Sequence, residues 1–291
     1  MTEPVAPAAA PALLERALRG AGYLPDAQTV DTVHLAEQLD KPVLVEGPAG
    51  TGKTALAKAV AQAEGAQLIR LQCHEGLDES KALYEWDYRR QLLRLQAGDG
   101  RDWDALEDDI FSPRYLLERP LLAAIRSEQR AVLLIDEVDR LDVEAEALLL
   151  EVLSEYQVSI PELGTVRART HPRTFLTSNN SRELSEALKR RCLYLHIGYP
   201  DAEREREIVT AHVPGITDVL ARQVADVLAS LRRLDLRKKP SVAETLDWAR
   251  TLVHLGAVDV DTAAVVRGLN LLLKNQADIE LVTGELARRP G

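Results

Sequence analysis

The sequence predicts a three-layer α/β domain with a five-stranded parallel sheet, followed by a small domain made only of helices. Five short apolar or β-branched runs alternate with helical patterns up to about residue 200, and this alternation is typical of a parallel sheet covered on both faces. After Pro200 the strand patterns stop. The composition is 46% hydrophobic but only 4% aromatic, which favours a helix-rich α/β protein over a β-sandwich.

The elements follow one another in a regular order. Residues 1–11 contain three prolines and predict a flexible tail. The strands are predicted at residues 43–46, 68–71, 132–135, 174–178 and 193–197. Helices are predicted at residues 12–19, 26–39, 53–64, 143–156, 201–211, 217–232, 241–255 and 259–275. These patterns place an α/β domain at residues 12–200 and a helical domain at 201–291.

Two insertions interrupt the alternation. Residues 72–112 are polar and irregular, yet the region up to Tyr115 holds half of the aromatic residues of the chain. These rings form either a packing cluster or a docking surface for a partner. Residues 156–169 consist of two β-like runs around the turn Pro161-Glu162-Leu163-Gly164, and they predict a hairpin.

Composition excludes several classes of protein. The 291 residues carry a net charge of −10, which makes nucleic acid an unlikely main partner because such binding depends on Lys and Arg. No apolar run approaches the length of a membrane span. The N-terminus lacks the basic start of a secretory signal, and two cysteines cannot form a disulfide framework. We therefore expect a cytoplasmic protein.

The first motif with a chemical role lies directly after the first predicted strand and opens a helix. It reads Gly47-Pro48-Ala49-Gly50-Thr51-Gly52-Lys53-Thr54 and matches the phosphate-binding loop pattern. In such a loop backbone N–H groups face the phosphates, and the helix N-terminus favours their negative charge. Lys53 is expected to reach the β- and γ-phosphates of ATP, and the Thr54 hydroxyl is expected to bind Mg²⁺.

Two acidic residues end the most apolar predicted strand. Asp136 and Glu137 follow the run Ala131-Val-Leu-Leu-Ile, and such a strand delivers them to the carboxyl edge of the sheet, where nucleotides bind in open α/β folds. We expect Asp136 to hold Mg²⁺, directly or through water. Glu137 is expected to polarise the attacking water, which is a separate task.

Two further patterns gain meaning from these motifs. Asn179 follows the strand at 174–178, where an amide can orient both the γ-phosphate and the attacking water. On its own, this pattern is also typical of a turn. Arg190 and Arg191 precede the last strand and suit the charge of a transferring phosphoryl group, although such residues also occur at solvated helix ends.

These motifs, in this order and before a helical lid, resemble those of the AAA+ ATPases. The segments AGYLPD, KPVLVEGPAGTGKT, LLIDEVD and HIGYPD are similar to the MoxR branch. The segments ALYEWDYRRQLLRLQ, DVEAEALLLEVLSEYQVSIPELG and LSEALKRRCLYLHIGYP look most like the CoxD-type ATPases of carbon monoxide dehydrogenase maturation. The resemblance spans about residues 12–275.

The resemblance implies roles for individual residues. Asn179 corresponds to sensor 1, and Arg191, helped by Arg190, to the arginine finger that reaches the nucleotide of a neighbouring subunit. Tyr23 and Leu24 lie where the adenine pocket of the family begins. Family members form rings, usually hexamers. The 72–112 segment takes the place of the helix-2 insert, and residues 156–169 that of the pre-sensor-1 hairpin.

The expected function is therefore Mg²⁺-dependent ATP hydrolysis by a ring that remodels or activates a client protein. The resemblance implies a metalloenzyme client, such as a molybdenum-containing dehydrogenase, and a von Willebrand factor A domain adaptor. A metal chelatase motor subunit, a nucleic-acid motor and a nucleotide-switched scaffold remain alternatives. The hairpin offers Arg167 and Arg169 against Glu162, which is a weak nucleic-acid surface.

Two points stay open at this level. The family carries a sensor-2 arginine where this sequence has Ser241, and Arg237, Lys238 and Lys239 are the nearby basic alternatives. Cys73 beside His74 is either a soft-metal contact or an ordinary strand-end cysteine next to a polar histidine.

Overall fold

The computed structural model describes residues 10–96 and 103–288, without the side chains of residues 103–105. Two compact units make up this part of the chain. The first runs up to Glu46 and continues from Thr54 to His196, and the second comprises Gly47–Lys53 and the chain from Ile197 onward. Each unit is described separately below.

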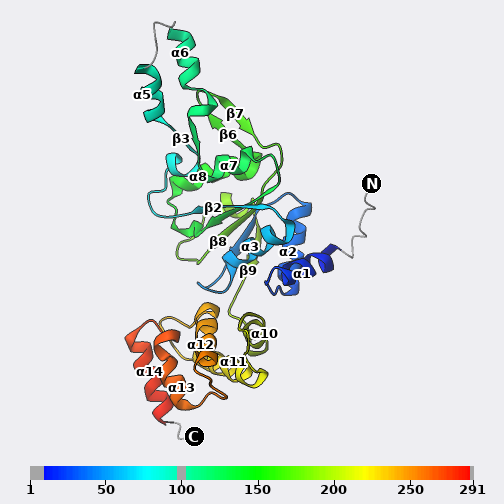
Figure 1. The fold of residues 1–291 in the computed structure, drawn as a ribbon, viewed down its shortest axis with the longest axis vertical. Helices are drawn as coiled ribbons and strands as arrows, with labels where there is room; N and C mark the ends of the chain where they lie inside the picture. Colours follow the sequence, from blue (N-terminus) through cyan, green and yellow to red (C-terminus); the bar gives the residue numbers. More distant parts are fainter. Residues whose placement is uncertain (1–9, 97–102, 289–291) are drawn as a thin grey trace. The chain divides into compact units, whose positions relative to one another are not determined.

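A five-stranded sheet forms the centre of the first unit (Figure 1). Its strands, all parallel, are β1 (Val43–Glu46), β2 (Gln67–Gln72), β5 (Ala131–Asp136), β8 (Arg173–Ser178) and β9 (Leu193–His196). Their spatial order is β2-β5-β8-β1-β9. The predicted fold class, an α/β domain with a five-stranded parallel sheet and a helical C-terminal region, is confirmed.

The register of the sheet brings three strand ends to one edge. Glu46 of β1 pairs with Ser178 of β8, and Ile135 of β5 pairs with Leu176 of β8. All residues of β5 and β8 are buried, as expected for central strands covered on both faces. The residues after these strands therefore emerge side by side from a buried platform.

Helices flank this sheet. Those with a direct place in the α/β alternation are α1 (Ala10–Gly20), α2 (Ala27–Gln38), α3 (Lys53–Glu64), α7 (Pro120–Arg126), α8 (Val143–Glu155) and α9 (Glu186–Lys189). Helix α2 packs against β1 and β9, while α7 packs against β2 and β5. Of the predicted tail, residues 1–9 lie outside the described residues. The prediction was wrong for Ala10 and Pro11, which already belong to α1.

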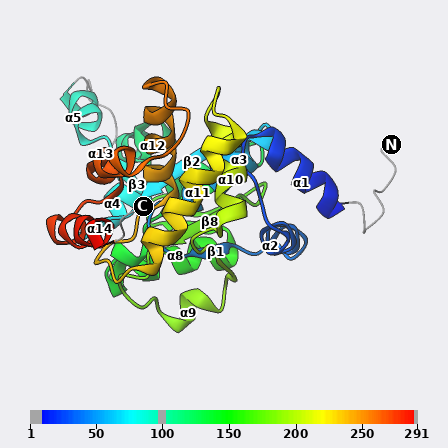
Figure 2. The same ribbon diagram turned by 90° about the horizontal axis from the view of Figure 1, so that it is seen from below.

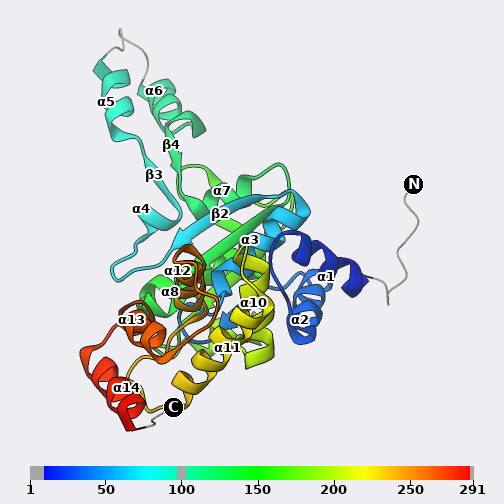
Figure 3. The same cartoon turned by 60° about the horizontal axis from the view of Figure 1, so that its bottom comes forward.

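The polar sequence of the first insertion predicted an irregular segment, but the structure shows helices and strands there. The insertion forms α4 (Glu79–Ala82), β3 (Tyr84–Trp86), α5 (Tyr88–Gln96), α6 (Trp103–Ile110), η1 (Pro113–Tyr115) and β4 (Leu116–Glu118). Strands β3 and β4 pair antiparallel, and α5 and α6 lie next to each other (Figures 1 and 3). Trp86 is buried, with its ring 5.3 Å from that of Phe111. Aromatic packing against the core of the unit orders this segment.

The second insertion forms a hairpin of β6 (Gln157–Ile160) and β7 (Gly164–Arg167), which pair antiparallel. Val158 and Ile160 are buried in the core of the first unit. The hairpin begins at Tyr156, which ends α8 in a left-handed conformation with φ 49°. This is the segment in which the sequence predicted a hairpin.

The described elements of the second unit from Ile197 onward are helical (Figure 2). They are α10 (Ala202–His212), α11 (Asp218–Arg233), α12 (Val242–His254), α13 (Thr262–Leu272) and α14 (Gln276–Arg288). The prediction of one helical segment at 259–275 was wrong at its end. Leu273 is extended, and the Asn275 side chain accepts a hydrogen bond from the N–H of Ala277, so a new helix starts there.

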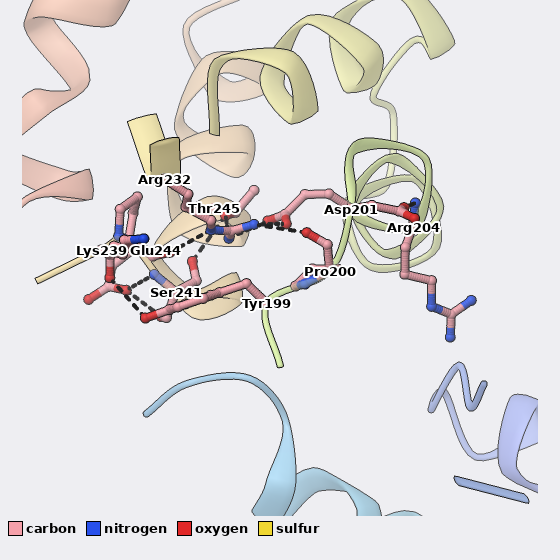
Figure 4. Close-up of polar contacts among 11 residues, drawn as sticks. Tyr199, Pro200, Asp201, Arg204, Arg232, Lys239, Ser241, Glu244 and Thr245 are labelled. Carbon is pink, nitrogen blue, oxygen red and sulfur yellow. Dashed lines mark hydrogen bonds and ion pairs between the residues drawn. The ribbon is translucent and has the colours of Figure 1, made fainter. Parts of the chain in front are cut away.

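A buried ion pair joins two helices of this unit, and its arginine also bonds to the turn before a third (Figure 4). The Arg232 guanidinium of α11 binds the Glu205 carboxylate of α10, with Nη2 3.0 Å from Oε1. Arg232 Nε also donates to the carbonyl of Pro240 at 2.9 Å, and the guanidinium lies over the ring of Tyr199. These contacts fix the turn that leads into α12. Among the described helices, none has both the length and the apolar character that crossing a membrane requires.

Candidate functional site

The Asp136 carboxylate is the centre of the polar contacts at the carboxyl edge of the sheet. Its Oδ1 accepts hydrogen bonds from the Thr54 hydroxyl at 2.9 Å and the Thr177 hydroxyl at 2.5 Å. Its Oδ2 accepts from Arg70, at 3.0 Å from Nε and 2.5 Å from Nη2. Burial raises the pKa of Asp136, but the hydrogen bonds from Thr177, Thr54 and Arg70 outweigh it and hold the pKa below its ordinary value.

Three elements bring these partners to Asp136. Thr54 lies in the first turn of α3, which begins one residue earlier. Thr177 is the penultimate residue of β8, the neighbour of β5. Arg70 comes from β2 on the other side of β5, where Gln72 pairs with Asp136. Strand order and register therefore assemble this cluster.

The donor atoms in this cluster fit a magnesium ion. Mg²⁺ prefers carboxylate and hydroxyl oxygens, and adjacent ligands of its octahedron lie about 2.9 Å apart, given the short bonds this ion requires. Thr54 Oγ1 and Asp136 Oδ1 are 2.9 Å apart. The described part of the chain contains no group of three or more His, Cys, Asp or Glu side chains arranged to hold a metal, so the candidate site rests on one carboxylate and a hydroxyl group.

Glu137 follows Asp136 in an uncommon backbone conformation. Its φ of 58° and ψ of 49° are left-handed, which costs about 1–2 kcal/mol for a residue other than glycine. Its N–H donates to the Thr177 hydroxyl at 2.9 Å, and its carboxylate forms an ion pair with Arg140 at 2.9 Å from Nε. The two adjacent carboxylates therefore have different partners, Arg140 for Glu137 and Arg70 for Asp136.

The loop that carries Asn179 is anchored to the same segment. The buried Asp139 carboxylate accepts from the N–H and the hydroxyl of Ser181, at 2.9 and 2.6 Å. Burial raises the pKa of Asp139, but the bonds from Ser181, together with a backbone bond from Asn179, lower it overall. Asn179 itself is half-buried.

The glycine-rich segment Gly47–Lys53 connects β1 to α3 and belongs to the second unit. Gly47 has φ 152°, and a Cβ there would lie 2.0 Å from the carbonyl oxygen of Ile197. Gly50 has φ 75°, and its Cβ would lie 2.4 Å from Ser241 Oγ. The buried Lys53 ammonium donates to the carbonyls of Gly47 and Pro48, at 2.7 Å each. The loop is a tight cradle that needs glycine at both positions.

The two arginines lie at the end of α9. Arg191 Nη1 donates to the carbonyl of Ala187 at 2.8 Å, and its Nε hydrogen-bonds to Ser154 of α8. Arg190 is exposed. In the described part of the chain neither arginine bonds to Thr54 or Asp136. Their action on the nucleotide of a neighbouring subunit stays a prediction.

The predicted adenine contacts lie between the first two helices. Tyr23 and Leu24 are half-buried in the turn from α1 to α2, and the Tyr23 N–H donates to the carbonyl of Leu18 at 2.9 Å. Tyr23 and Leu24 therefore lie in a hydrogen-bonded turn. Their contact with adenine stays a prediction.

Ser241 serves as the N-cap of α12, and its N–H donates to the Glu244 carboxylate at 2.7 Å. The side chains of Lys238 and Lys239 are exposed. The backbone of Arg237 and Lys238 is anchored, because their N–H groups donate to the buried Asp278 carboxylate. The structure leaves the sensor-2 residue unassigned.

Cys73 is buried, and burial, followed by the negative charges of Asp136, Asp139 and Glu137, raises the pKa of its thiol to about 12. His74 Nδ1 contacts the carbonyl of Glu75. Since a metal ligand needs the thiolate, this pair suits the ordinary strand-end role.

Sequence reasoning missed three residues of the site. Thr177 lies in the predicted strand 174–178 and Asp139 lies in the segment LLIDEVD, so their places at and just after strand ends were the available signal. Arg70 gave no signal, because its partner Asp136 is 66 positions away and only the strand order joins them.

Comparison with known proteins supports this description. Residues 43–199 match the ATPase family associated with various cellular activities, or AAA. The chain is 30% identical over 238 residues to gas vesicle ATPase GvpN2 of Halobacterium salinarum, covering 75% of this chain and 67% of that protein. It is 31% identical over 207 residues to gas vesicle ATPase GvpN of Haloferax mediterranei, covering 67% and 58%.

A solved structure supports the fold alone. A variant of RuvB from Thermotoga maritima superposes with a TM-score of 0.52 at 18% identity, covering 84% of this chain and 68% of that one. The AAA match spans more than half of this chain and includes the glycine-rich loop, Asp136, Glu137 and Asn179. Family membership implies ATP and Mg²⁺ binding and supports ATP hydrolysis as the general activity. The chain belongs to the AAA family of ATPases.

Proposed function

We propose that this chain is a Mg²⁺-dependent ATPase of the MoxR branch, which works as a ring of six subunits to remodel a protein client. The observation that carries the proposal is the 2.9 Å contact between the Thr54 hydroxyl and the Asp136 carboxylate. It joins the last residue of the phosphate-binding motif to the acidic end of β5. This is the donor pair that Mg²⁺ with a triphosphate needs.

In this proposal each residue has one task. The N–H groups of the glycine-rich loop and the Lys53 ammonium bind the phosphates, and Thr54 and Asp136 hold Mg²⁺, which neutralises phosphate charge when bound. Glu137 accepts a hydrogen bond from the attacking water and polarises it. The Asn179 amide orients the same water without ionising. Tyr23 and Leu24 contact the adenine.

Arg191 and Arg190 are proposed to act on the nucleotide of a neighbouring subunit. Arg191 is held by Ser154 and the Ala187 carbonyl, so its guanidinium is oriented before a neighbour arrives. A guanidinium supplied in this way stabilises charge on the phosphoryl group in the transition state. Each site is then complete only in the ring.

For the client there are two candidates. The resemblance of the insert and hairpin segments to CoxD-type ATPases supports a metalloenzyme, such as a molybdenum-containing dehydrogenase, with a von Willebrand factor A domain adaptor. The names of the relatives at about 30% identity favour a gas vesicle component instead. A metal chelatase motor would share the ATPase cycle and differ only in the client.

A nucleic-acid motor is the least supported alternative. The net charge of −10 opposes phosphate binding, and the likeness to RuvB concerns the fold alone. An ATPase rate that does not respond to single- or double-stranded DNA is the expected result. A nucleotide-switched scaffold would activate its client fully with a non-hydrolysable ATP analogue. The ATPase proposal expects that activation to need hydrolysis.

The test of the ATPase proposal uses two site variants and one control. Glu137→Gln should keep ATP affinity within about threefold but lose turnover by about 100-fold or more, because only the transition state needs the carboxylate. Lys53→Ala should weaken ATP binding itself. Lys58→Ala, on the exposed face of α3, should change neither. Full steady-state turnover in Glu137→Gln would contradict the role of Glu137.

The same Glu137→Gln variant identifies the client. With ATP bound and turnover blocked, a ring should retain its partners during affinity purification. Recovery of a metalloenzyme with a von Willebrand factor A protein supports the first candidate, and recovery of gas vesicle proteins supports the second. Lys53→Ala, which should not load ATP, is the matched negative control.

A further inference from the structure

We propose that Thr177 is a positioning residue for ATP hydrolysis, which fixes the Glu137 carboxylate relative to the Asp136 carboxylate. This inference rests on the proposed function, because it assumes that Glu137 polarises the attacking water. It adds a residue that does not touch the nucleotide and acts through two neighbours. Its hydroxyl is the only group of β8 that bonds to both residues, among those the structure describes.

The hydroxyl of Thr177 is both a donor and an acceptor. It donates its proton to Asp136 Oδ1 at 2.5 Å and accepts the N–H of Glu137 at 2.9 Å. The residue is buried, with 2% of its surface exposed, so water does not compete for these bonds. A hydroxyl has one donor and can accept at the same time, and this geometry needs both functions.

The contact acts on a strained backbone position directly after β5. Glu137 has φ 58°, a left-handed conformation that a glutamate keeps only when its surroundings hold it. The bond from its N–H to Thr177 is one such restraint, and the bond from the Arg140 N–H to the Glu137 carbonyl at 3.0 Å is another. Loss of the Thr177 hydroxyl therefore frees the backbone that aims the Glu137 side chain.

A second set of hydrogen bonds holds the loop on the other side of Asn179. Asp139 accepts two hydrogen bonds from Ser181. Asn179 thus lies between two residues, Thr177 and Ser181, that are both bonded to the segment 136–139. The hydrogen bonds of Thr177 and Ser181 to the segment 136–139 therefore fix the position of Asn179 relative to Glu137, the two residues that orient the water in the proposed mechanism.

The same strand supplies a matched control. Thr174 is also buried in β8, but its hydroxyl donates to the Pro172 carbonyl at the opposite end of the strand. Thr174→Val and Thr177→Val each remove one buried hydroxyl from β8 at nearly constant volume. They differ in whether that hydroxyl contacts Asp136 and Glu137.

The experiment compares Thr177→Val, Thr177→Ser and Thr174→Val for turnover, nucleotide affinity and thermal stability. Thr177→Val should lower kcat by about tenfold or more and leave the affinity for a fluorescent ATP analogue, measured without Mg²⁺, within about threefold. Thr177→Ser, which keeps the hydroxyl, should restore kcat. Thr174→Val should keep the wild-type kcat even if it melts earlier. If Thr177→Val does not fold, Thr177→Ala takes its place.

The outcomes separate this inference from the proposed function. Wild-type kcat in a folded variant without the Thr177 hydroxyl, together with an inactive Glu137→Gln, overturns the positioning role alone. Full steady-state turnover in Glu137→Gln overturns the role that the proposed function gives to Glu137. A kcat loss in Thr174→Val equal to that in Thr177→Val would reduce the effect to general destabilisation and overturn the inference. In the Glu137→Gln background, Thr177→Val should add no further loss of turnover.

Discussion

The Arg70 guanidinium binds the Asp136 carboxylate through two nitrogens, with both hydrogen bonds directed to Oδ2. Arg70 is about half exposed, whereas the Asp136 side chain is only 5% exposed. The buried carboxylate thus carries a cation on one oxygen and two hydroxyl groups on the other. Arg70 thus neutralises the buried carboxylate at Oδ2, and in the proposed function Mg²⁺ would supply a second positive charge when bound.

The first prediction concerns the loss of this cation. Arg70→Gln should lower the free energy of unfolding of the nucleotide-free protein by about 1–2 kcal/mol, because the buried Asp136 carboxylate loses its cation. The loss is modest because the Arg70 side chain is about half exposed, so water already weakens the ion pair. Saturating Mg²⁺ and ATP should reduce the difference from wild type. Denaturant unfolding with and without Mg²⁺ and ATP measures both. An equal loss under the two conditions would contradict the compensation argument.

The pH dependence of this variant has a definite sign. The pKa of Asp136 lies below its ordinary value in the folded protein, so the stability from its partners is present at neutral pH and is lost as the pH falls through that lowered pKa. The stability gap between wild type and Arg70→Gln should therefore close in acid. A gap that widens below pH 4 would show that Arg70 acts through another group.

The second prediction concerns the close approach of the glycine-rich loop to Ser241. Gly50→Ala should abolish nucleotide binding or weaken it by about 100-fold, because its Cβ would meet Ser241 Oγ at 2.4 Å in a left-handed backbone. Gly65→Ala is the control, since Gly65 has φ 62° but no atom within 4 Å of the added Cβ. Binding of a fluorescent ATP analogue distinguishes the two. Equal, intact binding in both variants would show that the loop moves freely away from Ser241.

The third prediction concerns the buried ion pair of the second unit. Arg232→Leu should destabilise that unit by about 3–5 kcal/mol, because Glu205 would be left as a buried charge without its partner. The double variant Arg232→Leu with Glu205→Leu should recover part of the loss. Urea unfolding followed by the fluorescence of Trp248, which lies in the core of this unit, reports it. A double variant less stable than Arg232→Leu would mean that Glu205 has another stabilising partner.

The fourth prediction concerns thiol reactivity. The pKa of Cys73 is raised to about 12, so the folded protein holds almost no thiolate at pH 8. Alkylation of Cys73 by iodoacetamide at pH 8 should be at least about 100-fold slower in the folded protein than in denaturant. Mass spectrometry of the labelled peptide measures this rate. Rapid labelling in the folded state, or protection that depends on added Cu(I), would restore the metal-contact hypothesis.

The sequence predicted the sheet well because its signals are local. Strands such as β5 are continuous apolar runs that end in polar residues, and helix starts carry capping side chains such as Asp142 and Asp201. The structure of the first insertion was not predicted, because its sequence is polar and its order depends on Trp86 and Tyr115, which pack in the core of the first unit. The break before α14 was not predicted, because its sequence signal is a single residue, Asn275, whose side chain accepts a hydrogen bond from the N–H of Ala277.

For this protein, the amino-acid sequence alone determined the five strands, the helical C-terminal region, and the residues of the phosphate-binding loop and the acidic strand end. These features depend on contacts between near neighbours and on side-chain pattern. Only the tertiary structure decided that Arg70, Thr54 and Thr177 share one carboxylate, and that Gly50 touches Ser241. Such contacts join residues tens or hundreds of positions apart. They follow from strand order and helix packing, which no local pattern encodes.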